Sequence, residues 1–181
     1  GAFFILFPVF FVLTRRQAIL ATLYYKPTFM QFILLTHTRE LNKASATGPL
    51  VKSLLQQDCH IIEWQRKVPS KLLLTLEPTR SALVYLTPTD RAHSITSVHT
   101  SQLQQIDTCV ILDGTWQEAK KIYNRSPYLQ QLPHYTLTTD RLSAYCLRRN
   151  QLPTGLCTAE VVMELLQANQ EHARANSLEP A

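Results

Sequence analysis

A carboxylate, a glycine and a large aromatic ring stand close together at Asp113, Gly114 and Trp116. The apolar run Cys109–Leu112 before them predicts a buried strand, and Asp113 with Gly114 ends it. In open α/β sheets, ligands bind at the edge where parallel strands end. Glycine lets a ligand approach the backbone there, and the indole offers a flat apolar face. This stretch therefore indicates a ligand site at the end of a strand.

A structural interpretation of the same stretch is also open. Thr115 is a suitable N-cap for a helix in which Trp116, Ala119 and Tyr123 recur at helical spacing. In this interpretation Asp113 also caps the helix and Trp116 belongs to the core.

Basic and aromatic residues are interleaved in the second half of the chain. The aromatic residues are Tyr123, Tyr128, Tyr135 and Tyr145, and the basic residues among them are Lys120, Lys121, Arg125, Arg141, Arg148 and Arg149. This pattern suits RNA, because cations bind phosphates and rings stack on unpaired bases. An ordinary solvated face gives the same pattern. The net charge of +5 permits a polyanionic partner without requiring one.

Several other kinds of chemistry lack their sequence signals. The six histidines show neither HxxxH nor HxH spacing, so no metal site is predicted. No GxSxG elbow is present, and the four glycines form no phosphate-binding loop. The four cysteines form no CxxC pair, which indicates buried thiols in a reducing compartment and hence a cytoplasmic location.

Strands and helices alternate along the chain. Strands are predicted at Phe29–Thr36, His60–Trp64, Ala82–Leu86, Cys109–Leu112 and Tyr135–Thr138. Helices are predicted at Pro49–Leu55, at Thr115–Tyr123 and from an N-cap at Thr158, whereas Lys71–Leu76 suits either structure. The alternation predicts an α/β fold with a mostly parallel sheet and helices on both faces.

Three polar loops are expected to meet in that fold, because parallel strands place their strand-to-helix loops at one edge. These loops are Thr36–Gly48, Asp113–Trp116 and Ser143–Glu160.

The ends of the chain differ in composition from its middle. Residues 1–28 begin with an apolar run that is short for a bilayer and is followed, not preceded, by Arg15 and Arg16. An oligomer-facing strand or an altered start would each explain it, and oligomeric state stays open. The catalytic domain is predicted at 29–170, with fraying beyond Gln167 and a polar tail at 171–181.

Five ordered blocks resemble the DTW-domain family. The first is Asp113-Gly-Thr-Trp116 with the Gln-Glu-Ala-Lys-Lys that follows it. The other blocks are Ser126–Leu129, Arg141–Arg148, Leu156–Glu160 and the upstream run His37–Gly48. Together they place the resemblance over roughly Phe32 to Leu166.

The resemblance implies tRNA-uridine aminocarboxypropyltransferase activity on a SPOUT-like fold with a C-terminal trefoil knot. Such enzymes transfer the 3-amino-3-carboxypropyl group of S-adenosylmethionine to N3 of a tRNA uridine and release methylthioadenosine. A SPOUT-like methyltransferase and a non-catalytic RNA-binding module are the alternatives.

The resemblance also assigns roles to residues. Asp113 would be the catalytic base that takes the weakly acidic N3 proton. Cofactor binding is expected of Thr47, Gly48, Leu86, Pro88, Leu112, Gly114, Thr115, Trp116, Ser143, Tyr145, Leu156, Cys157, Thr158, Ala159 and Glu160. RNA binding is expected of Lys43, Lys120, Lys121, Arg125, Arg141, Arg148 and Arg149. The last three arginines are candidates for the cofactor carboxylate as well as for tRNA phosphates.

One departure concerns the start of the chain. Family members commonly begin with a cysteine-rich, zinc-type segment, whereas the first thirty residues here contain no cysteine. Metal binding is therefore not expected of this chain.

Overall fold

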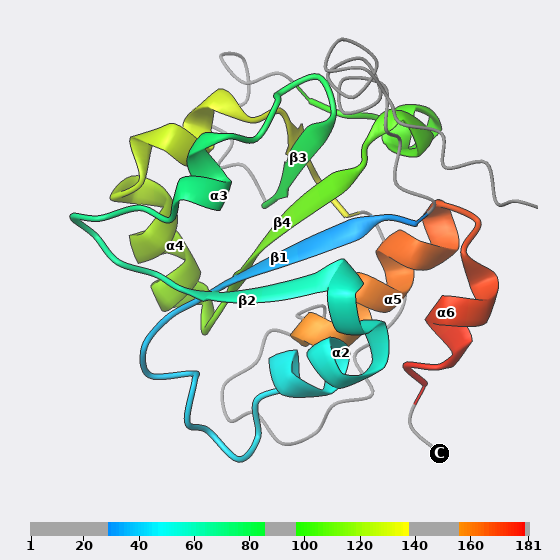
Figure 1. Cartoon of the computed structure of the whole chain (residues 1–181), viewed down its shortest axis with the longest axis horizontal. Helices are drawn as coiled ribbons and strands as arrows, with labels where there is room; N and C mark the ends of the chain where they lie inside the picture. Colours follow the sequence, from blue (N-terminus) through cyan, green and yellow to red (C-terminus); the bar gives the residue numbers. More distant parts are fainter. Residues whose placement is uncertain (1–28, 86–96, 138–155, 180–181) are drawn as a thin grey trace, which may run out of the picture.

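A five-stranded sheet forms the centre of the structure (Figure 1), a computed structural model that describes residues 29–85, 97–137 and 156–179. Its strands are β1 (Gln31–Thr36), β2 (Cys59–Glu63), β3 (Ser81–Val84), β4 (Thr108–Asp113) and β5 (His134–Tyr135). Their order is β2-β1-β4-β3-β5, and every pairing is parallel. The predicted α/β class and parallel sheet are confirmed for this part of the chain.

The two central strands, β1 and β4, are apolar on both faces, as expected of a strand covered by helices on each side. In β1, Phe32 and Leu34 join one core cluster, whereas Ile33 and Leu35 join the other. The alternation follows from strand geometry, in which successive side chains point to opposite faces.

The helices divide between the two faces of the sheet (Figure 1). On one face lie α2 (Gly48–Leu55), α5 (Thr158–Ala168) and α6 (His172–Asn176). On the other lie α3 (Lys71–Leu74) and α4 (Trp116–Asn124). Short 3₁₀ helices occur at η1 (Gln56–Asp58), η3 (Thr100–Gln105) and η4 (Pro127–Gln131). The ambiguous segment Lys71–Leu76 thus forms a short helix.

The start of α5 differs from the prediction. Cys157, not Thr158, is the N-cap residue, and its backbone N–H donates to Glu160 Oε2 at 2.7 Å. Thr158 is the first residue of the helix, and its hydroxyl donates instead to Asp113. Sequence preference favoured the threonine as the cap, but its hydroxyl has a charged partner in the folded protein.

The prediction that the chain frays beyond Gln167 is wrong. After α5 the chain turns back and α6 packs against it, with Ala175 fully buried and Leu178 nearly so. The polar composition misled the prediction, because Arg174 of α6 and Glu171 just before it are paired within the protein.

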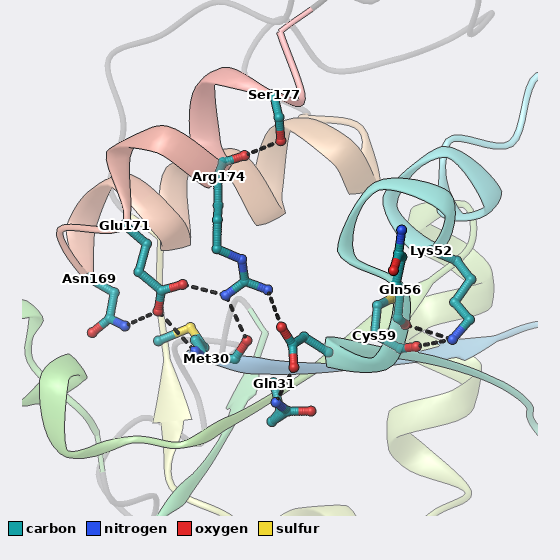
Figure 2. Close-up of polar contacts among 10 residues, drawn as sticks. Met30, Gln31, Lys52, Gln56, Cys59, Asn169, Glu171, Arg174 and Ser177 are labelled. Atoms are coloured by element: carbon teal, nitrogen blue, oxygen red, sulfur yellow. Dashed lines mark hydrogen bonds and ion pairs between the residues drawn. The ribbon is translucent and has the colours of Figure 1, made fainter. Parts of the chain in front are cut away.

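Arg174 makes most of those pairs, around the start of β1 (Figure 2). Its guanidinium donates to Asp58 Oδ2 at 3.1 Å, to Glu171 and to the Met30 carbonyl at 3.4 Å. Glu171 in turn accepts from the backbone N–H of Met30 at 2.9 Å. The guanidinium also lies 4.7 Å from the centre of the Phe29 ring. This network fixes α6 to the amino end of the sheet.

Some predictions fall on residues outside the described part of the chain. They include the apolar segment 1–28, and the described residues do not test the C-terminal trefoil knot that the resemblance implies. Both remain predictions. Within 29–85, 97–137 and 156–179, no helix has the length and apolar character needed to cross a bilayer.

Candidate active site

Asp113 is the last residue of β4 and pairs in register with Thr36, the last residue of β1. The connections after these two strands lead to opposite faces of the sheet, to α2 after β1 and to α4 after β4. In parallel sheets such a switch point opens a crevice beyond the strand ends. Asp113 therefore stands at the position where this fold class binds ligands.

The carboxylate of Asp113 is buried and held by two hydroxyls. Thr36 Oγ1 donates to Oδ2 at 3.1 Å, and Thr158 Oγ1 donates to Oδ1 at 2.6 Å. Only 3% of Asp113 is exposed. The donors come from β1 and from the start of α5, so segments of all three predicted loops meet here, as expected.

The β1–α2 connection closes against this carboxylate. Thr47 Oγ1 accepts from the backbone N–H of Ala159 at 3.2 Å, which joins the connection to α5. A Cβ atom at Gly48 would lie 3.1 Å from Asp113 Oδ2 and 3.4 Å from Leu34 Cδ1. Glycine at position 48 therefore lets the start of α2 pack closely against the carboxylate.

Glu118 shapes the turn that follows Asp113. It accepts from the backbone N–H of Thr115 at 2.9 Å, and its own N–H donates to the Thr115 hydroxyl at 3.3 Å, which forms a capping box. A Cβ atom at Gly114 would lie only 3.0 Å from Glu118 Cβ, so the tight turn suits glycine.

The environment of Glu118 favours its charged form. Burial raises its pKa, but the hydrogen bonds from Thr115, with the nearby His37 and Lys43, outweigh burial and leave the pKa below its ordinary value. An ionised carboxylate in the first turn also suits the positive end of the helix dipole.

Trp116 presents its ring to solvent at the start of α4. Its exposed fraction is 51%, so it is not a core residue, and Thr115, not Asp113, caps the helix. The structural interpretation of this stretch is therefore wrong on both points. The indole stacks on Tyr85 with centroids 5.8 Å apart, and Tyr85 stacks on Tyr123 at 4.3 Å. Tyr85 thus packs against the indole and is itself packed on Tyr123. About half of the Trp116 surface remains exposed and available to a ligand.

His37 links these parts and was not predicted as a site residue. Its backbone N–H donates to the Asp113 carbonyl at 3.0 Å. Its ring Nδ1 lies 3.5 Å from Glu118 Oε1 and 3.3 Å from the backbone nitrogen of Arg39. The ring also stacks on Trp64 at 5.9 Å. Its place directly after an apolar strand was the available sequence signal, as it was for Thr36.

The buried thiols make poor nucleophiles. Cys59, Cys109 and Cys157 are free and buried, as predicted. Burial raises the pKa of Cys59 to about 11 and that of Cys109 to about 12, and it also raises the pKa of Cys157. Among the described residues, no group of three or more His, Cys, Asp or Glu side chains is placed to hold a metal ion.

Comparison with known families matches the DTW domain over residues 15–180. The chain belongs to the DTW domain family. It is 26% identical over 143 residues to tRNA-uridine aminocarboxypropyltransferase 2 of Macaca fascicularis, which covers 75% of this chain and 47% of that protein. The protein of the same name from Drosophila melanogaster is 24% identical over 147 residues, covering 75% and 55%. The chain thus spans about half the length of the curated relatives it matches, and no solved structure matches it.

The DTW domain places its predicted cofactor residues in different surroundings. Gly48 and Thr158 lie against the Asp113 carboxylate with Thr47 beside them, whereas Gly114, Thr115 and Trp116 follow Asp113 in the turn to α4. Leu112, Cys157 and Ala159 are buried, and Leu156 and Glu160 are half-buried. Leu86, Pro88, Ser143 and Tyr145 lie outside the described residues. The cofactor role of each residue remains a prediction.

The predicted RNA-binding residues also differ in their surroundings, and some of them lie outside the described part of the chain. Lys120, Lys121 and Arg125 are exposed on α4. Lys43 is exposed but pairs with the buried carboxylate of Glu40. Arg141, Arg148 and Arg149 lie outside the described residues.

Proposed function

We propose that this DTW domain transfers the 3-amino-3-carboxypropyl group of S-adenosylmethionine to N3 of a uridine in tRNA. The products would be the acp3U nucleotide and methylthioadenosine. The family membership and the names of the two relatives support a transferase acting on tRNA uridine. The observation that carries the proposal is the buried Asp113 carboxylate at the switch point of the sheet, held by two threonine hydroxyls.

Asp113 would remove the N3 proton of the uridine. This N–H is weakly acidic, and the nitrogen is a poor nucleophile until the proton leaves. A carboxylate has about four acceptor positions, and the two threonine hydroxyls occupy two of them. Acceptor capacity therefore remains for the base, and the hydroxyls hold the carboxylate in one orientation.

Residues around Asp113 fit a donor of this kind. Thr47, Gly48 and the segment Leu156–Ala159 would hold its amino-acid and adenosine parts. Thr47 is hydrogen-bonded to Ala159, and Gly48 packs next to the carboxylate, so these segments adjoin the proposed base. When bound, the donor supplies an electrophilic Cγ carbon next to a sulfonium. Because the thioether leaves as a neutral group, the protein needs no general acid, and its remaining task is orientation.

Trp116 would position the uridine. Its ring is backed by Tyr85 and half exposed, so a base can stack on it without displacing core side chains.

The test is mass spectrometry of unmodified tRNA incubated with S-adenosylmethionine and the wild-type chain or Asp113→Asn. The wild type should add an aminocarboxypropyl mass to uridine and release methylthioadenosine. The isosteric amide keeps the fold but cannot take the proton, so turnover should fall by about 10²–10⁴-fold.

Other outcomes would contradict the proposal. A methyl-sized gain with release of S-adenosylhomocysteine would identify a methyltransferase. Binding of tRNA without any product would identify a non-catalytic RNA-binding module. Near-normal turnover in a folded Asp113→Asn protein would remove Asp113 from the role of base.

A further inference from the structure

Exposed cations gather on two neighbouring segments at the carboxyl edge of the sheet. One segment is the outer face of α4, and the other is the turn between β2 and α3. We call these side chains the basic surface: Arg66, Lys67, Lys120, Lys121 and Arg125. None of them makes an ion pair with any residue in the part of the chain that the structure describes.

Trp64 joins the two segments. Its backbone N–H donates to the Thr36 carbonyl at 2.8 Å, and its indole N–H donates to Ser126 Oγ at 2.9 Å. Lys121 Nζ lies 5.9 Å from the centre of the Trp64 ring. The turn is thus anchored beside α4 at its first residue.

Arg66 and Lys67 follow Trp64 by two and three residues, which is at most about 7–11 Å of extended chain. Figure 1 shows the β2–α3 connection leaving the sheet at the edge where α4 begins. The cations of the turn therefore lie near those of α4, and they extend the surface beyond the residues predicted from sequence.

Several cations elsewhere in the described chain are paired within the protein. Arg174 pairs with Asp58 and Glu171, and Arg80 pairs with Asp107. Lys52 donates to two backbone carbonyls of its own face of the sheet. Outside the basic surface, Arg39 and Lys71 are also exposed without an ion pair among the described residues, but the basic surface gathers five such cations on two adjoining segments.

We propose that the basic surface binds the phosphate backbone of the tRNA substrate and leads the target uridine to Trp116 and Asp113. This inference rests on the proposed function. Lys120 follows Trp116 by four residues, so the two side chains are neighbours on one face of α4. A backbone lying across Arg66, Lys67 and α4 would therefore deliver an unstacked base to the exposed indole.

The experiment measures tRNA affinity against salt concentration for the full chain and for Arg66→Gln/Lys67→Gln. Each lost phosphate contact reduces the slope of log affinity against log salt by about 1, so the double variant should lose about 2. The matched control is Arg66→Lys/Lys67→Arg, which keeps both charges and should keep the slope. Both variants should keep the wild-type melting temperature, because neither side chain is paired.

The outcomes separate this inference from the proposed function. An unchanged slope in the neutral variant, or no tRNA binding by the wild type, would overturn the basic surface. If the neutral variant lost binding to phosphatidylserine vesicles but bound tRNA as the wild type does, the basic surface would not be the tRNA-binding surface. Product formation is scored separately by mass spectrometry. Wild-type protein that binds tRNA through these residues without forming product would refute the transferase proposal and leave the surface in place.

Discussion

At the scale of the residue, two threonine hydroxyls donate to the Asp113 carboxylate and fix its orientation. A buried carboxylate without donors would be costly, and hydrogen bonds to a charged group each contribute about 1.5–3 kcal/mol. Thr36 and Thr158 supply those bonds from two separate elements. Folding of the β1–α2 and α5 segments therefore sets the orientation of the proposed base.

Thr158→Val tests whether Thr158 positions Asp113. Valine keeps the shape of threonine but removes the donor at 2.6 Å from Oδ1. We expect kcat to fall by about 10- to 100-fold, because the carboxylate loses its fixed orientation. The free energy of unfolding should fall by about 1–3 kcal/mol.

Thr158→Ser is the matched control for that variant, since it keeps the hydroxyl and should restore most of kcat. A Thr158→Val protein with raised KM for S-adenosylmethionine and unchanged kcat would instead place Thr158 on the donor. That split distinguishes a positioning residue from a binding residue.

At the scale of the element, the strands and the cap of α4 could be predicted because they depend on local sequence patterns. Apolar runs located all five strands to within a few residues, and Thr115 was identified as the cap of α4. Runs of this kind reflect burial on both faces, which sequence displays directly.

Predictions failed where a tertiary partner overrode the local preference. Thr158 has the chemistry of a cap but donates to Asp113, and Trp116 has the spacing of a core residue but is half exposed. Thr36 and His37 were missed as individual site residues because their contacts with Asp113 and Glu118 join segments distant in sequence, although both stand at the end of an apolar strand. Glu118 was missed although its place three residues after Thr115 is the local pattern of a capping box.

The capping box of α4 predicts a pH dependence of stability. The pKa of Glu118 in the folded protein lies below the ordinary value of 4.5. Its stabilising contribution is therefore complete above about pH 4.5 and is lost as the pH falls through the folded pKa. Glu118→Gln keeps the size of the side chain but removes the charge at the helix N-terminus.

Urea unfolding of the wild type and Glu118→Gln between pH 7 and pH 3 measures this contribution. The wild type should be more stable by about 0.5–1 kcal/mol at pH 7, and the difference should shrink toward zero at the acid end. If the difference in free energy of unfolding stays constant over the whole pH range, hydrogen-bond geometry and not charge accounts for the stabilisation by the capping box.

At the scale of the whole molecule, the two ends of the sheet differ in what their charges do. At the carboxyl end, exposed cations lie along α4 and on the turn between β2 and α3. At the amino end, Arg174 is 16% exposed and paired with carboxylates from η1 and from the loop before α6 (Figure 2). The amino end thus stabilises the fold, and the carboxyl end is available for ligands.

Arg174→Ala tests this division between the two ends. Removing the guanidinium leaves Asp58 and Glu171 partly buried without their cation, and it releases α6 from the start of β1. Breaking a buried pair from one side is strongly destabilising, so we expect the free energy of unfolding in urea to fall by about 2–4 kcal/mol. At a temperature where the variant is folded, kcat/KM should equal that of the wild type, because no partner of Arg174 contacts the Asp113 site.

Arg174→Lys keeps the charge without the forked geometry, so its stability should lie between that of the wild type and that of Arg174→Ala. A loss of kcat/KM in folded Arg174→Ala, at unchanged stability, would instead couple the amino end of the sheet to the reaction.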